Sequence, residues 1–249
     1  MPADAPPPYT YQSIPHDEEA QLADSDAFKL DTTVEQSDPE VRALFVRKVY
    51  TVLFLQLVGT AAVAAAMSTS GAVAWVTNHP ALLLVPLVGS LATLGALYWK
   101  SLSHPANLIL LALFTLMESL LLGAIVAVAD RTAVLQAVVL SAVVFGALSL
   151  YTLQTRHHFA SLASYLYYAL MLLVGIGLVQ LVLPYSHTFE LVYSVAGCAV
   201  FSGYILFDTY LLQQRLSPDA WVLANVSLYL DVLNLFLSVL RLLNATSDD

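Results

Sequence analysis

The sequence predicts an all-α, polytopic membrane protein with about seven transmembrane helices, and three observations lead to this fold class. Hydrophobic residues make up 59% of the chain, charged residues make up only 11%, and the mean hydropathy is +0.75. These values lie far from those of an ordinary soluble domain. The apolar residues also fall in runs of about 20, the length that crosses roughly 30 Å of hydrocarbon. A soluble enzyme and a nucleic-acid-binding protein are therefore excluded.

The apolar runs predict a bundle of seven helical spans joined by short loops that carry Pro, Asn, Ser or charge. Each span satisfies its own backbone polar groups through helical hydrogen bonds. The seventh is the most polar, so it must face protein or water. The transmembrane domain is expected over 44–244, between a tail at 1–43 and a short end at 245–249. The predicted spans are Leu44–Met67, Ala81–Trp99, Ala106–Ala129, Ala133–Leu153, Leu162–Leu183, Phe189–Leu212 and Trp221–Leu243.

The positive charges predict which side of the membrane each loop occupies, because Lys and Arg in short loops are retained in the cytoplasm. The loops and span ends on one side carry six of them, whereas the opposite loops hold only Arg131, and Arg241 lies at the end of the seventh span. The six are Arg42, Arg47, Lys48, Lys100, Arg156 and Arg215. The N-terminal tail is therefore expected in the cytoplasm. With no basic n-region before an apolar stretch, the first span is expected to direct insertion.

The tail carries most of the acidity of the chain and a proline-rich motif. Ten of the eighteen Asp and Glu residues lie between Asp4 and Glu40, and large apolar residues are few, so disorder is expected in isolation. Pro6, Pro7 and Tyr9 form a PPxY sequence, which is typical of ligands for WW domains. A WW-domain ubiquitin ligase is the partner this motif predicts. The alternative is a proline-rich end without a partner.

Three carboxylic acids lie deep within the predicted spans: Glu118, Asp208 and Asp231. An ionised group within hydrocarbon costs a few kcal/mol or more, so it needs a partner or a watery cavity. No Lys or Arg lies as deep. These acids must therefore stay protonated, share a proton, meet water or bind a cation.

Asp208 and Asp231, on consecutive spans, are the candidates for a proton-responsive pair. Two carboxylates held close together resist double ionisation. Once deprotonated, their oxygens suit a hard cation such as Ca²⁺, which takes six to eight oxygen ligands, and a transient permeation site fits better than tight storage. At about 1.5 Å per residue, however, Asp208 lies roughly 7 Å and Asp231 roughly 15 Å from the predicted ends of their spans. The alternative is that each aspartate only forms interhelical hydrogen bonds.

Four segments resemble the Bax inhibitor and Lifeguard proteins, also called the transmembrane Bax inhibitor motif family. They are FTLMESLLLG from Phe114, LSLYTLQT from Leu148, GYILFDTYLL from Gly203 and LYLDVLNLFLSVLRLL from Leu228. The resemblance covers roughly residues 40 to 244, and the order and spacing of the four segments make it specific.

This resemblance implies six helices around a central, polar seventh helix. It also implies a pH-sensitive Ca²⁺ leak across an endomembrane, such as that of the endoplasmic reticulum, vacuole or Golgi, and a role in restraining stress-induced cell death. Ca²⁺ is then the permeant ion, and no cofactor is implied. Asp208 and Asp231 match the family's paired aspartates, proposed to sense protons and gate the pore. Some members carry an arginine in the second helix that can pair with an aspartate, but here the second span has no basic residue before Lys100.

The sequence-based hypothesis is that titration of Asp208 and Asp231 changes the contacts of spans six and seven and so controls a cation path past Glu118. Whether acid opens or closes this path is left open. One alternative is an intramembrane aspartyl protease, which also uses two aspartates on neighbouring helices. Its motifs resemble Tyr-Asp and Gly-X-Gly-Asp, whereas Phe207 and Leu230 precede the acids here. The other alternative is a proton-coupled transporter. A non-enzymatic function is expected.

Overall fold

A computed structural model of the chain describes residues 39–155, 157–180, 182, 186–214 and 220–247. The backbone of this part forms α-helices and one short 3-10 helix, and contains no strand, which confirms the all-α prediction. Pro6, Pro7 and Tyr9 lie outside the described residues, as does most of the predicted tail. The elements are α2 (Pro39–Met67), α3 (Ser70–Asn78), η2 (Pro80–Leu83), α4 (Leu84–Lys100), α5 (Ala106–Val128), α6 (Arg131–Gln154), α7 (Leu162–Gln180), α8 (His187–Gln214) and α9 (Trp221–Ser247).

Seven of the described helical segments are long and apolar enough to cross a membrane, with η2 and α4 together forming the second. They coincide with the seven predicted spans to within five residues at each end. The largest difference is at α2, which begins at Pro39 rather than Leu44. Proline suits the first turn of a helix because its missing N–H needs no partner there, and Glu40 favours the positive end of the helix dipole.

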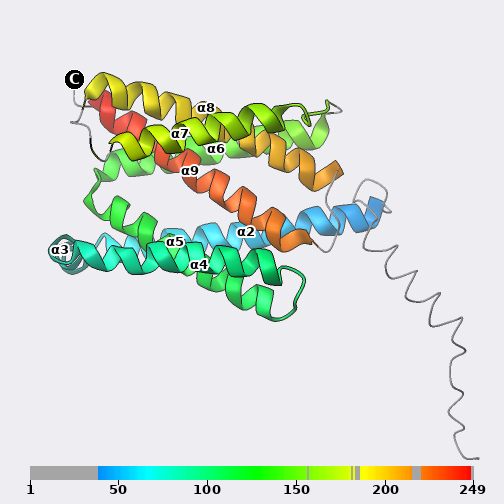
Figure 1. Cartoon of the computed structure of the whole chain (residues 1–249), viewed down its shortest axis with the longest axis horizontal. Helices are drawn as coiled ribbons and strands as arrows, with labels where there is room; N and C mark the ends of the chain where they lie inside the picture. Colours follow the sequence, from blue (N-terminus) through cyan, green and yellow to red (C-terminus); the bar gives the residue numbers. More distant parts are fainter. Residues whose placement is uncertain (1–38, 156, 181, 183–185, 215–219, 248–249) are drawn as a thin grey trace, which may run out of the picture. The chain divides into compact units, whose positions relative to one another are not determined.

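The helices run up and down, so that the connections alternate between two sides. We call the side on which α2 begins the proximal side and the side on which it ends the distal side. The α4–α5, α6–α7 and α8–α9 connections are proximal. The α5–α6 and α7–α8 connections are distal, together with the end of α9 and the short helix α3, which is seen end-on in Figure 1 because it runs across the bundle.

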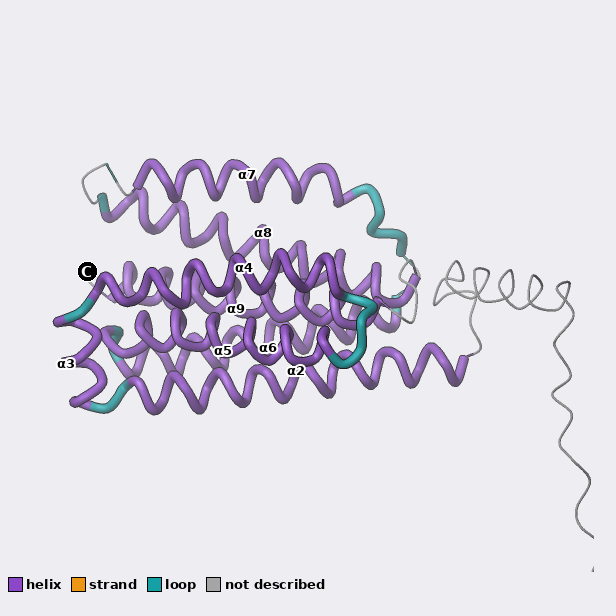
Figure 2. The backbone as a smooth tube through the Cα atoms, turned by 60° about the horizontal axis from the view of Figure 1, so that its bottom comes forward, coloured by secondary structure: helices purple, strands orange, loops and turns teal. Residues whose placement is uncertain are grey.

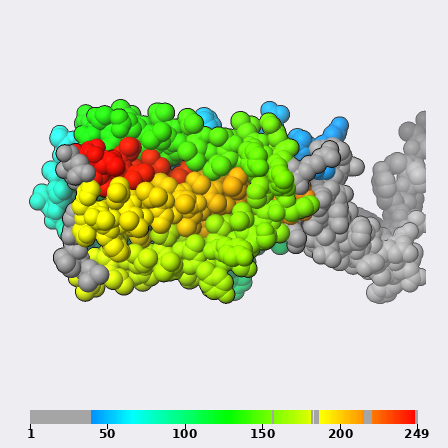
Figure 3. Space-filling model, turned by 90° about the horizontal axis from the view of Figure 1, so that it is seen from above, coloured from blue at the N-terminus to red at the C-terminus, as the bar shows by residue number. Residues whose placement is uncertain are grey.

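Helix α9 occupies the centre of the bundle. Of its most apolar 18 residues 61% are buried, whereas the share in the other six spans is 11% to 33%. It packs against α8, α6, α2 and α5, and it crosses obliquely between the α2–α5 side and the α7–α8 side (Figure 1). Helix α7 lies at the outside beside α8 (Figure 2). In Figure 3 the last part of α9, in red, reaches one face of the bundle beside the yellow start of α8.

Candidate functional site

The polar side chains of α9 are spaced so that four of them share one face. They follow one another at intervals of four, three and four residues, which places them along a single stripe of a helix. Two of these side chains form hydrogen bonds with the backbone of α9 itself. The Asn234 amide donates to the carbonyl of Leu230 at 2.8 Å, and the Ser238 hydroxyl donates to the carbonyl of Asn234 at 2.7 Å. The four residues are Ser227, Asp231, Asn234 and Ser238.

Helix α8 runs antiparallel to α9 along this stripe and approaches it closely. A Cβ atom on Gly197 would lie only 2.5 Å from the Ser238 hydroxyl oxygen, so the contact requires glycine. Near the other end of the contact the side chain of Asp208 lies next to those of Ser227 and Asp231, close enough to interact with both. The helices therefore bring the two predicted aspartates together.

The Asp208–Asp231 contact can be a hydrogen bond only if one of the two carboxyl groups carries a proton, because two carboxylates offer acceptors and no donor. Asp231 is 6% exposed, and its Oδ2 atom is buried without a hydrogen-bond partner in the described part of the chain. Asp208 is half-buried. The arrangement allows the two carboxyl groups to share one proton, and it leaves the Asp231 Oδ2 atom without a partner.

The sequence places Asp208 and Asp231 at different depths along their helices, and the directions of their side chains compensate for this difference. Asp208 lies about 9 Å from the end of α8 at Gln214, and Asp231 about 15 Å from the start of α9 at Trp221. Every Cα–Cβ bond in a helix leans toward the helix N-terminus. In this antiparallel pair, Asp208 therefore leans toward the distal side and Asp231 toward the proximal side, so the two carboxyl groups converge.

No cation balances the pair within the described residues. Arg241, on the same helix as Asp231, lies 3.9 Å from Glu190 at the distal end instead, and Lys48 stacks on the ring of Trp221. The second span contributes Lys100 only, at its proximal end. In the described part of the chain, no three His, Cys, Asp and Glu side chains lie close enough to hold a metal ion.

Glu118 lies apart from the aspartate pair. Its half-buried side chain faces α4, where it lies beside the buried Ser90. Helix α5 makes extensive contact with α4 and α2 but little with α9. The three acids of the sequence-based hypothesis thus form one pair and one separate group.

A second polar cluster fixes the opposite face of α9. The Tyr229 hydroxyl lies 2.8 Å from Thr60 Oγ1 on α2, and Thr60 Oγ1 lies 3.0 Å from Ser119 Oγ on α5. Because the Thr60 hydroxyl donates its proton to the carbonyl of Gln56, Tyr229 is the donor to Thr60. The Tyr229 ring meets Phe114 edge to face, with centroids 6.1 Å apart. One turn earlier, Asn225 donates to the carbonyl of Val49 at 3.1 Å.

Comparison with known proteins identifies the family. Residues 42–248 match the family described as "Inhibitor of apoptosis-promoting Bax1". The chain is 38% identical over 246 residues to protein lifeguard 4 of Mus musculus, which covers 98% of this chain and 99% of that protein. The chain belongs to the Bax inhibitor and Lifeguard family.

Two further relatives widen the range of organisms in which similar chains of this family occur. The Golgi anti-apoptotic protein of vaccinia virus (strain Lister) is 39% identical over 223 residues, covering 89% of this chain and 94% of the viral one. Bax inhibitor 1 of Schizosaccharomyces pombe is 35% identical over 242 residues, covering 97% and 90%. The family resemblance read from the sequence is confirmed.

Sequence reasoning missed the partners of the carboxyl groups in this Bax inhibitor family member. Ser227 lies four residues before Asp231, and that spacing already puts it on the same helix face. Ser90 gave no such signal, because its pairing with Glu118 depends on how α4 and α5 are rotated. Thr60 and Tyr229 lie 169 residues apart, and their contact follows only from the central position of α9.

Proposed function

We propose that this chain is a pH-sensitive Ca²⁺ leak channel of an intracellular membrane and that it restrains stress-induced cell death. The observation that carries the first part is the contact between the side chains of Asp208 and Asp231, on α8 and α9, which no described cation neutralises. The names of the relatives support the second part, since one is called a Golgi anti-apoptotic protein and another Bax inhibitor 1.

The pair works as a latch whose strength depends on one shared proton. With that proton, one carboxyl group donates to the other and holds α8 against α9. Without it, two negative charges face each other in a site from which water is largely excluded. Two unit charges about 4 Å apart repel by roughly 4 kcal/mol at an effective dielectric constant of 20. Loss of the proton therefore drives the two helices apart.

The moving element of this proposal is α8, because α9 is held on its other face. Tyr229 and Asn225 bind α9 to α2, and Tyr229 also packs on Phe114 of α5. Helix α8 has few contacts with α2 and packs mainly against α9, α6 and the outer helix α7. Separation of the pair then displaces α8, with α7 beside it, and opens a path along the polar stripe of α9.

Ca²⁺ uses the same oxygens as the proton. The carboxylates of Asp208 and Asp231, which include the unpartnered Oδ2 atom of Asp231, and the hydroxyl of Ser227 offer oxygen ligands to an ion that keeps some of its water. Two carboxylates form an incomplete shell, which suits transient passage. Protons compete with Ca²⁺ for these oxygens, so both competition and the latch predict that acid closes the leak. In this proposal the path does not pass Glu118, whose side chain faces α4.

The orientation proposed here follows the positive charges. Arg42, Arg47 and Lys48 precede or open the first span, so the proximal side faces the cytoplasm and the distal side faces the lumen of an endomembrane compartment. Ca²⁺ then leaks from the lumen into the cytoplasm. A WW-domain ubiquitin ligase that binds the PPxY sequence of the cytoplasmic tail remains the predicted protein partner.

The test is Ca²⁺ flux into dye-loaded proteoliposomes that contain the full chain, measured across about pH 5 to 8. Flux above that of empty liposomes is expected, and it should rise with pH. A change of 1.4 kcal/mol alters a population tenfold, and the repulsion above exceeds that, so a rise of at least about tenfold is expected. Flux that equals the empty-liposome background at every pH would refute the leak.

The same proteoliposomes distinguish the proposed leak from the two alternative functions. A proton-coupled transporter would show saturable, substrate-driven proton uptake, whereas a leak carries Ca²⁺ down its gradient without it. An intramembrane aspartyl protease would cleave membrane-span peptides added to the vesicles. The residues before the acids, Phe207 and Leu230, differ from the protease motifs, and we propose no catalytic role for the pair.

A further inference from the structure

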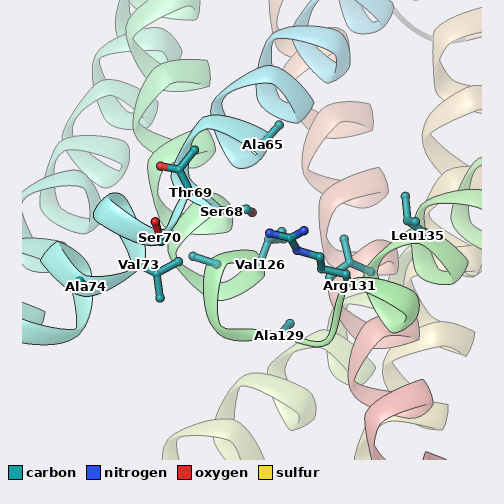
Figure 4. A pocket seen from close by; sticks show the side chains of 12 residues that line it. Ala65, Ser68, Thr69, Ser70, Val73, Ala74, Val126, Ala129, Arg131 and Leu135 are labelled. Atoms are coloured by element: carbon teal, nitrogen blue, oxygen red, sulfur yellow. The ribbon is translucent and has the colours of Figure 1, made fainter.

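A cavity lies at the distal end of the bundle, on the opposite side from the aspartate latch. It has a volume of about 780 Å³, which is within the usual range for small-molecule sites. Its walls come from the end of α2, from α3, from the end of α5 and from the start of α6 (Figure 4). Helix α3, which runs across the bundle end (Figure 1), contributes Ser70, Val73 and Ala74 to the lining.

One cation lines this cavity. Arg131, the first residue of α6, extends its guanidinium group toward the end of α2, where Ser68 lies (Figure 4). Arg131 forms no ion pair or hydrogen bond with any described residue. The neighbouring acid, Asp130, is the N-cap residue of α6. Its carboxylate accepts a hydrogen bond from the Ala133 N–H at 2.9 Å. The cavity therefore presents an unpaired positive charge.

The remaining wall combines hydroxyl groups with apolar surface. Ser68 and Thr69 donate back to carbonyl groups of α2, but the Ser70 hydroxyl has no hydrogen-bond partner among the described residues. Val73, Val126 and Leu135 supply the apolar part. Leu135 is 67% exposed, so the apolar wall continues onto the outer surface of α6, where lipid chains lie.

We propose that this cavity binds the phosphate headgroup of an anionic phospholipid from the distal leaflet. A guanidinium group binds phosphate oxygens in a bidentate manner, and Ser70 offers a further donor. The half-exposed Trp75 on α3 marks the level of the membrane interface, where amphipathic rings prefer to lie and where phosphates are found. The acyl chains then run down the apolar surface beside Leu135. This site is independent of the proposed leak.

The test is the thermal stability of the full chain in neutral detergent, with and without added lipid. A ligand that binds only the folded state stabilises it, so saturating phosphatidylglycerol should raise the melting temperature by about 5 °C, whereas phosphatidylcholine should not. Arg131→Gln should lose this shift. The matched control is Arg241→Gln, which removes a distal arginine that is paired with Glu190 and should keep the shift.

A second variant tests the cavity without replacing Arg131, so that misfolding of Arg131→Gln does not decide the result. Ala74→Trp keeps Arg131 but fills the cavity from α3, and it should lose the shift as well. An equal shift in wild type and Arg131→Gln would overturn the proposal, as would an equal shift from phosphatidylcholine. Inorganic phosphate is the third probe: if it stabilises the wild type as strongly as phosphatidylglycerol does, the site binds a free anion and the lipid proposal is wrong.

Discussion

The double variant Asp208→Asn, Asp231→Asn is expected to fold and to leak Ca²⁺ at a low rate that no longer depends on pH. Two amide side chains can hydrogen-bond to each other at every pH, because each carries both a donor and an acceptor. The latch then stays closed, and the rise of at least about tenfold expected for the wild type between pH 5 and pH 8 disappears. The measurement is Ca²⁺ flux in proteoliposomes, with folding checked by the melting temperature.

The matched control for this variant is Glu118→Gln. It removes a carboxyl group that lies within the membrane but pairs with Ser90 instead of an aspartate. Both its flux and the pH at which flux rises are expected to match those of the wild type, because Glu118 faces α4 and not the path. A double asparagine variant that retained the wild-type pH profile would remove Asp208 and Asp231 from the gate.

Replacement of Tyr229 by alanine is expected to cause the largest loss of stability in the bundle. Its side chain is fully buried at the centre, and truncation of a buried aromatic residue costs about 3 to 5 kcal/mol through the cavity it leaves. Tyr229→Phe removes only the hydrogen bond to Thr60, and interhelical hydrogen bonds in membranes contribute about 0.6 kcal/mol on average.

Unfolding of both variants in detergent micelles measures this difference. If Tyr229→Phe destabilised the protein as much as Tyr229→Ala, the hydrogen bond, and not the volume of the ring, would hold α9 in place. Either variant also loosens the anchored face of α9. We therefore expect Tyr229→Ala to raise Ca²⁺ flux at pH 5, where the aspartate latch alone remains.

The spans were predictable because a run of about 20 apolar residues has few alternatives to a membrane helix. The polar residues of α9 indicated that it faces protein or water, and the resemblance to the Bax inhibitor and Lifeguard family implied its central position. Helix α3 was not predicted: nine residues are too few to span a membrane, and the segment reads as a loop. The distal cavity depends on how α3 folds back across the bundle, which hydropathy does not encode.

The site was predictable in part for a similar physical reason. Asp208 and Asp231 stand out because burying a carboxyl group in hydrocarbon is costly, and the contact between them agrees with that argument. The sequence singles out Glu118 for the same reason, yet its side chain faces Ser90 and not an aspartate. Depth along a helix follows from residue number, but rotation about the helix axis follows from packing. That rotation decides which carboxyl groups meet.

The central claim is that one proton shared by Asp208 and Asp231 keeps the leak closed, and infrared spectroscopy of the purified chain tests it most directly. A protonated carboxyl group has a C=O stretching band that is lost on ionisation, and the difference between wild type and the double asparagine variant isolates the band of the pair. We predict that this band declines over the same pH interval in which Ca²⁺ flux rises. Flux that changes with pH while the band stays constant would contradict the account.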